Sequence, residues 1–361
     1  GILLHLSKGK RCSFQGFGVV WQAIILLFAF NVAQLLWVEN GWQHFYFSIK
    51  ILLFGMLAVQ LSLQKKERGW VGVVFSLQLI ALLTLSTLQI ITKRSIGGVW
   101  CWLGERSFSS LTPGIALQSL LGGLYLRPYA TFSHPNVLAG YAVLVVLWNY
   151  LFFVPRTPVQ RKIKIVGLVV GIITILISWS QGVWLSLVGV FIVGKLLSKW
   201  PDLKSYSLFA GVIICLTIPF LLVVGERMVG NLFLSEEIVV RNRLFQNFIQ
   251  HLPNALIGGY GWHGTWQQSR LGAAALLGYR GLQPVHNAAW YIISSIGVVG
   301  VTILALISYK IIKKLSFYQV LIILLIIFLS TVDHYPITQQ QTLLLAILLL
   351  GLSAVSGKTV R

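Results

Sequence analysis

The stretch Lys65–Ile91, KKERGWVGVVFSLQLIALLTLSTLQII, decides the fold class of this chain. Its first four residues form a basic cluster, and the 22 residues from Trp70 to Ile91 carry no charged side chain. A helix rises about 1.5 Å per residue, so this segment is long enough to cross the ~30 Å hydrocarbon core of a bilayer. The stretch therefore predicts a membrane-crossing helix with one basic flank.

Apolar runs of this kind recur along the whole chain. The mean hydropathy is +0.82, and 57% of the 361 residues are hydrophobic while only 10% are charged. So few polar groups cannot cover a water-soluble domain. We predict an all-α, polytopic transmembrane helix bundle, with residues 1–361 forming a single integral membrane domain. The ten expected spans are Phe17–Trp37, His44–Leu63, Trp70–Ile91, Val137–Phe153, Ile165–Ser178, Val183–Leu197, Tyr206–Val224, Ala288–Ser308, Val320–Val332 and Thr342–Ala354.

Basic residues gather in alternate loops between these spans. They hold 18 of the 28 Lys and Arg residues, so the positive-inside rule places these loops and both termini in the cytoplasm. The two long loops, residues 92–136 and 225–287, then lie outside the cytoplasmic (inner) membrane, and we expect both to contain short helices. We assign the net charge of +20 to orientation and to contact with anionic membrane lipids, not to nucleic acid.

Several reaction classes lack their sequence motifs. The chain has no phosphate-binding loop ending in Gly-Lys-Ser/Thr, no His-Glu-x-x-His pair and no cysteine-pair spacing. ATP hydrolysis and a tightly held zinc therefore both lack support. None of the eight acidic residues falls inside an expected span, whereas ion-coupled transporters usually keep a buried carboxylate on the ion path. This makes a transporter the less favoured alternative.

The second long loop begins with an amphipathic helix, expected to start after Ser235 and to end before Pro253. At about 100° per residue, Arg241 shares a face with apolar side chains while Arg243 points the other way. A guanidinium on an apolar face is costly unless it meets an anion. We therefore favour Arg241 as a ligand contact, with lipid phosphate at the membrane interface as the alternative. The apolar residues of this face are Ile238, Phe245, Phe248, Ile249 and Leu252.

A glycine-rich aromatic segment, Gly258–Trp266, follows that helix. Glycines let a backbone come close to a substrate, and aromatic faces can stack on sugar rings. An interfacial loop with membrane-belt tryptophans explains the same composition equally well.

The loop re-enters the membrane at His286-Asn287. A histidine at that boundary could act as a base near neutral pH, although a lone boundary histidine is more often an interface residue. Gly297 and Gly300 follow in the next span and suit close helix contact.

Four segments occur in a fixed order along the chain. The first is Arg127–Tyr141 (RPYATFSHPNVLAGY), and the second is Arg241 with Phe245, followed by Gly259-x-Gly261. The third is His286-Asn287, separated by nine residues from Gly297-x-x-Gly300, and the fourth is Asp333-His334-Tyr335-Pro336. Together they resemble the motifs of the O-antigen ligase/polymerase family of membrane proteins. The matching region extends from Arg127 to the C-terminus.

The resemblance implies glycosyl transfer on the extracytoplasmic side, from a polyprenyl-diphosphate-linked glycan to a hydroxyl of a glycolipid, glycan or protein acceptor. It implies no nucleotide sugar, no cofactor and no required metal. Arg241 first and Arg127 second would bind the diphosphate, His286 would be the base, and Asn287 would orient the acceptor. Further donor contacts and supporting residues would be His134, Asn136, His334, Tyr260, Trp262 and Gln181.

Two positions depart from the family pattern. Ser180-Gln181-Gly182 stands where the family often has Ser-Arg-Gly/Ala, so one phosphate contact is lost and donor affinity is in doubt. Ala130 replaces the usual glycine before Thr131-Phe132. A ligase, a polymerase and a protein O-oligosaccharyltransferase remain open within the family. A polyprenyl-lipid or polysaccharide transporter remains open outside it.

Overall fold

A computed structural model of the protein describes residues 14–63, 68–120, 122–229, 236–262, 264, 285–312 and 315–353. These residues form a mostly helical membrane protein, as predicted. Each expected span lies on a helix, and six helices among the described residues are long and apolar enough to cross a membrane. The helices at the expected spans are α1 (Phe14–Gln34), α2 (Gly41–Leu63), α3 (Arg68–Thr92), α5 (Pro135–Phe152), α6 (Pro158–Ile177), α7 (Gln181–Lys199), α8 (Lys204–Val229), α12 (Ala288–Ile312), α13 (Phe317–Val332) and α15 (Gln340–Ser353).

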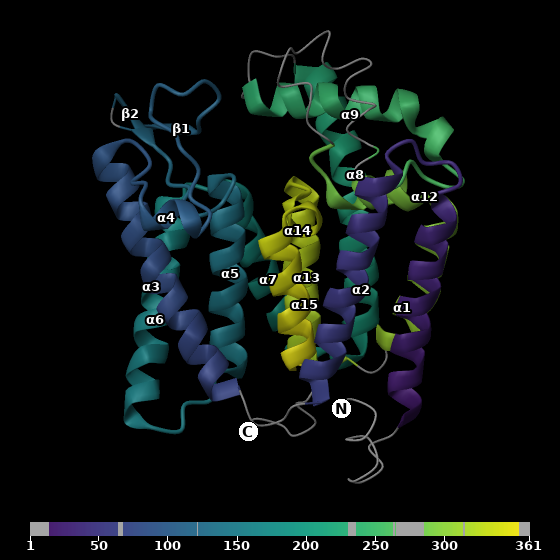
Figure 1. The fold of residues 1–361 in the computed structure, drawn as a ribbon, viewed down its shortest axis with the longest axis horizontal. Helices are drawn as coiled ribbons and strands as arrows, with labels where there is room; N and C mark the ends of the chain where they lie inside the picture. The colour runs from purple at the N-terminus through teal and green to yellow at the C-terminus, as the bar shows by residue number, and fades with distance from the viewer. Residues whose placement is uncertain are drawn as a thin grey trace.

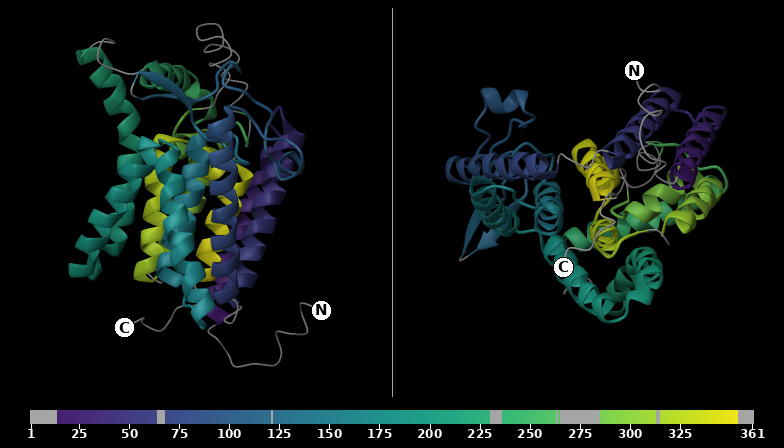
Figure 2. Two further views of the ribbon diagram at one scale, coloured as in Figure 1. Left: turned by 90° about the vertical axis from the view of Figure 1, so that its left-hand side faces the viewer. Right: turned by 90° about the horizontal axis from the view of Figure 1, so that it is seen from below.

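The long helices run up and down between two ends of the bundle (Figure 1). Helices α3, α5 and α6 pack together on one side, and α1, α2 and α12 pack together on the other. Between them, α15 contacts both α2 and α5, and α13 contacts α7 and α8, an arrangement visible from below in Figure 2. We call the end that carries the two long connections the loop end.

The core is densest around α5. The ring of Trp148 is fully buried and packs edge-on against Phe75 of α3, with 5.5 Å between ring centroids. Leu138 and Leu144 of the same helix are also almost completely buried. Because α5 is packed on most sides, the position of its first residues relative to the other helices is fixed. These residues belong to the candidate site described below.

The first long loop is fastened to α3 by two buried polar side chains. Glu105 accepts hydrogen bonds from the backbone amides of Ile96 and Gly97, each at 2.8 Å, and from Gln89 of α3 at 2.8 Å. The side-chain oxygen of Gln89 in turn accepts from the amides of Tyr129 at 3.0 Å and Ala130 at 2.8 Å. These bonds hold the chain that leads from Arg127 into α5.

The first loop contains a β-hairpin as well as a short helix, α4 (Val99–Trp102). Strand β1 (Leu117–Leu120) pairs antiparallel with β2 (Gly123–Leu126), and Leu117 lies opposite Leu126. The prediction of short helices alone was therefore incomplete. Gly122, with φ of 80°, lies in the turn between the strands, a conformation that suits glycine.

The second long loop contains α9 (Glu236–Ala255), which lies across the loop end (Figure 1). The helix continues past the predicted end and takes Pro253 into its last turn. A proline costs less there, because few helical bonds remain to be broken. Ser235, the predicted cap, and Thr265-Trp266 of the glycine-rich segment lie outside the described residues.

Helix α12 is broken at Gly297, whose φ is 63°. The backbone at residues 256–261, which we call the strap, fills the break. The amides of Tyr260 and Gly261 donate to Ser294 and Ser295 at 2.8 and 2.9 Å. In return, the amides of Val298 and Val299 donate to the carbonyls of Leu256 and Ile257 at 2.8 and 3.3 Å. Gly297 thus allows the helix to break, because its φ suits glycine. Gly300 instead leaves room for the ring of Phe30 in α1.

Candidate functional site

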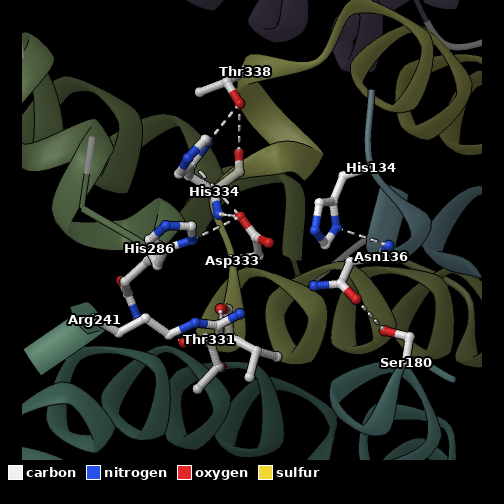
Figure 3. A network of polar contacts seen from close by, with 11 residues as sticks. His134, Asn136, Ser180, Arg241, His286, Thr331, Asp333, His334 and Thr338 are labelled. Atoms are coloured by element: carbon white, nitrogen blue, oxygen red, sulfur yellow. Dashed lines mark hydrogen bonds and ion pairs between the residues drawn. The ribbon is translucent and has the colours of Figure 1, made fainter. Parts of the chain in front are cut away.

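Side chains from five separate parts of the chain meet near the loop end (Figure 3). Helix α9 contributes Arg241, and the residue pair before α12 contributes His286. Asp333 ends α13, and His334 begins the short helix α14 (Tyr335–Thr338). The start of α5 contributes His134 and Asn136, and the segment after β2 contributes Arg127. The fold thus brings together predicted residues from both long loops, Arg127 and His134 from the first and Arg241 and His286 from the second.

Asp333 lies between two imidazole rings. Its Oδ1 is 3.5 Å from Nδ1 of His286 and 3.9 Å from Nε2 of His334. The same oxygen accepts a hydrogen bond from the backbone amide of His334 at 2.8 Å. Burial acts to raise the pKa of this carboxyl, but the hydrogen bond and charge of His286 hold it below its usual range. Asp333 is therefore a permanent negative charge next to His286.

His334 is anchored by Thr338. The Thr338 hydroxyl lies 2.7 Å from Nδ1 of His334 and 3.2 Å from the carbonyl of His334. The other ring nitrogen, Nε2, faces Asp333. Burial lowers the pKa of His334 to about 4, although Asp333 opposes the shift. His334 is neutral at physiological pH.

Arg241 points into the site, as the helical periodicity predicted. Its Nη1 donates to the carbonyl of Val332 at 2.9 Å, directly before Asp333. Arg241 is partly buried, whereas Arg243 is exposed. A guanidinium has five N–H donors, and within the described residues Arg241 uses one of them. The others are available to an anionic ligand.

Arg127 is 6% exposed and is held by oxygen atoms from two helices. Its Nε donates to the carbonyl of Ser178 at 2.9 Å, and Nη2 donates to Oδ1 of Asn136 at 2.7 Å. Ser180 donates to the same Asn136 oxygen at 3.1 Å. Asn136 therefore orients Arg127, and Ser180 supports Asn136.

His134 joins the two halves of the site. Its Nδ1 accepts from the amide of Asn136 at 3.1 Å, which caps the start of α5. Burial lowers the pKa of His134 to about 3, with an opposing contribution from Asp333 and further lowering by Arg127, His286 and Arg241. Because charges from both long loops act on one ring, the loops converge here.

Asn287 is buried and fully occupied by the fold. Its amide nitrogen donates to the carbonyls of Cys215 at 2.8 Å and Thr331 at 3.2 Å, and its oxygen accepts from the amide of Trp290 at 3.1 Å. These bonds cap α12 and tie it to α8 and α13. The side chain of Asn287 thus holds the segment that carries His286 against three helices.

Tyr260 and Trp262 lie apart from the charged cluster. The Tyr260 hydroxyl donates to the carbonyl of His251 at 2.9 Å. The Trp262 indole donates to Asn31 of α1 at 2.6 Å and packs on Tyr291, with ring centroids 6.1 Å apart. Gln181 is exposed at the first turn of α7. Tyr260 and Trp262 therefore support the strap and the helices around it.

His286, Asp333 and His334 also place one potential metal-ligand atom each within 4.8 Å of one another. A divalent cation at this point would face Arg241, whose charge contributes, after burial, to the lowered pKa of His334. The charges around the three residues therefore suit an anion better than a second cation. That the protein needs no metal stays a prediction.

Sequence reasoning did not assign roles to Asp333, Ser180 or Thr338. Asp333 carried a signal, because it is an acid in an otherwise apolar chain and belongs to the Asp333-His334-Tyr335-Pro336 motif. Ser180 and Thr338 are ordinary hydroxyl residues whose partners become visible only in the fold.

No known protein family and no curated protein matches this sequence.

Proposed function

We propose that the protein is a membrane glycosyltransferase that moves a glycan from a polyprenyl-diphosphate donor to an acceptor hydroxyl. The observation that carries the proposal is that His286 and the partly buried Arg241 meet at Asp333, with His286 3.5 Å from its carboxylate and Arg241 bound to the carbonyl of the residue before it. This arrangement puts a base next to an anion-binding group at the end of a membrane bundle.

In this proposal His286 removes the proton from the acceptor. Nδ1 of His286 lies 3.5 Å from the Asp333 carboxylate, and in the proposed step Nε2 takes the hydroxyl proton. The acceptor oxygen then forms a bond to the anomeric carbon of the donor glycan. The bond from that carbon to the diphosphate oxygen breaks, and the proton remains on His286 with Asp333 beside it.

The leaving polyprenyl diphosphate gains negative charge during this step. Within the described residues one N–H group of Arg241 is hydrogen-bonded, to the carbonyl of Val332, and Arg127 is bonded to Asn136, near His134. Guanidinium groups bind phosphate oxygens in a bidentate manner and stabilise charge that develops in the transition state. Gln181 cannot replace them, since it is neutral and exposed.

The position of the site suits a lipid-linked donor. His286 lies two residues before Ala288, the first residue of the apolar helix α12, so the reacting groups would be at the level of lipid head groups. A polyprenyl chain could then remain in the bilayer while its diphosphate meets Arg241.

The test uses purified protein in vesicles with a defined polyprenyl-diphosphate glycan and a set of candidate acceptors. We expect a new glycosidic product, lost in Arg241→Ala and in His286→Ala while both variants remain folded in membranes. A ladder of repeats would identify a polymerase, and one transferred chain would identify a ligase. Full transfer by both variants would refute the proposal, and donor movement across the bilayer without a new bond would indicate a transporter.

A further inference from the structure

The strap and the break in α12 form an exchange of backbone hydrogen bonds. In an uninterrupted helix, the amides of Val298 and Val299 would donate to Ser294 and Ser295 four residues earlier. At the break, residues 256–261 supply the acceptors for these amides and the donors for these carbonyls. Four polar groups inside an apolar bundle are thereby paired, and each would cost several kcal/mol if left open in hydrocarbon.

The crossing requires glycine on both chains. Gly259 and Gly297 have φ of 76° and 63°, where a side chain is strained. A Cβ at Gly297 would collide with the carbonyl of Ile257, and one at Gly259 would collide with the carbonyl of Ser295. The two backbones therefore touch directly.

Gln34 of α1 clamps the crossing from outside. Its side-chain nitrogen donates to the carbonyl of Gly258 in the strap at 2.6 Å and to the carbonyl of Ser295 in α12 at 2.9 Å. One donor group thus binds both partners, so the strap and the break are fixed by a third helix.

Helix α9 is attached to α12 at a second place. Trp290 of α12 packs against Phe245 and Phe248 of α9, with ring centroids 5.9 and 6.0 Å apart. Arg241 lies one helical turn before Phe245, and His286 lies four residues before Trp290. Two attachments fix both the position and the direction of α9, and so they fix where Arg241 lies relative to His286.

We propose that Gly259 and Gly297 are positioning residues that, through the strap, hold Arg241 at its working distance from His286. The effect on catalysis rests on the glycosyl transfer proposed above, whereas the effect on the position of α9 does not. Misplacing a reactive group by about 1 Å can reduce a rate roughly 100-fold. We expect a loss of that order in kcat for Gly297→Ala, together with a rise in the KM for the donor, because Arg241 is the group that binds the diphosphate.

The experiment measures geometry and activity in the same variants. Spin labels at Arg243→Cys and Gln340→Cys, both exposed at the loop end, report the distance between α9 and the start of α15 by pulsed electron resonance. Gly297→Ala should shift or broaden this distance. Gln34→Met removes the clamp without backbone strain and should act in the same direction to a smaller extent, which keeps the test valid if Gly297→Ala does not fold.

Gly225→Ala is the matched control, since a Cβ at this helical glycine of α8 meets no atom within 4 Å, and it should leave distance and rate unchanged. The inference is overturned if Gly297→Ala and Gln34→Met keep the native distance, or if the distance changes while kcat stays normal. If even the unaltered protein transfers no glycan, the proposed function fails, and the distances still decide whether the strap positions α9.

Discussion

At the scale of single residues, Asp333 sets the chemistry of the site. Its carboxylate contacts His286, receives the amide of His334, and lies next to the carbonyl bound by Arg241. An imidazole beside a fixed negative charge gains stability in its protonated form. That is the form a base must reach after it has taken a proton.

Asp333→Asn tests this role with almost no change in shape. We expect glycan transfer to fall by roughly 10²–10⁴-fold, the range that general acid–base catalysis contributes, because the neutral amide no longer stabilises protonated His286. The rate of product formation in vesicles measures this fall in glycan transfer. Asp202→Asn, in the exposed turn before α8, is the control and should be normal. Equal rates for the two variants would remove Asp333 from the mechanism.

Arg241→Lys tests whether the guanidinium shape matters. Lysine keeps the charge but loses the planar fork that binds two phosphate oxygens. Loss of a charged hydrogen bond of about 1.5–3 kcal/mol should weaken donor binding by about 10- to 100-fold, measured as KM or as direct binding of a polyprenyl diphosphate. Arg243→Lys, on the exposed side of the same helix, should bind normally. Equal losses in both would point to general surface charge.

The residue scale also shows what periodicity can and cannot predict. The choice of Arg241 over Arg243 followed from helix geometry, which depends on neighbours in the sequence, and Arg241 is indeed the more buried of the two. The contact of Asp333 with His286 joins α13 to the segment before α12, so no local pattern could reveal it. Asn287 was likewise predicted as a site residue, and only its three buried hydrogen bonds showed its supporting role.

At the scale of elements, the apolar runs predicted where helices lie because lipid forces a spanning segment to pair its own backbone. The hairpin β1–β2 was missed, although Gly122-Gly123 between two apolar segments is a recognised turn signal. The break at Gly297 could not be predicted, because it depends on the strap. A glycine in a span equally suits a close helix contact.

The start of α5 gives a prediction about pH. The folded pKa of His134 is about 3 against an ordinary value of 6.5. Below pH 6.5 the unfolded chain therefore binds a proton that the folded chain does not, and stability falls by up to about 1.4 kcal/mol per pH unit from this group until the pH approaches 3.

His134→Asn should reduce this loss, because asparagine also caps helices well and does not titrate. Thermal unfolding in detergent at pH 7.5 and pH 5 measures the difference for both proteins, with His251→Asn on α9 as the control. If the variant loses as much stability as the original protein, His134 is not the titrating group. The remaining dependence is expected to come from His334, whose pKa is also lowered.

At the scale of the whole molecule, the up-and-down path places both long connections at one end (Figure 1). The turn between α5 and α6, which contains Arg156, and the turn between α7 and α8, which follows Lys199, lie at the other end. The predicted sidedness requires this separation of the long loops from the basic turns.

Cys101 offers a direct test of sidedness. It is exposed in the first long loop, whereas Cys215 is buried within α8. A thiol reagent that cannot cross membranes should label Cys101 from outside in right-side-out vesicles. A Val159→Cys variant, with its thiol exposed on the first turn of α6, should react only after the vesicles are opened. The reverse pattern would invert the topology and place the site in the cytoplasm.

The strap has one more consequence, for the order in which the protein is made. Residues 256–261 leave the ribosome before Gly297 does, and Gln34 leaves before either. When α12 enters the membrane, the strap that completes the hydrogen bonding at its break has therefore already been synthesised. A chain in the opposite order would have to insert a helix with open amides and wait for their partners, so the direction of translation itself favours correct insertion.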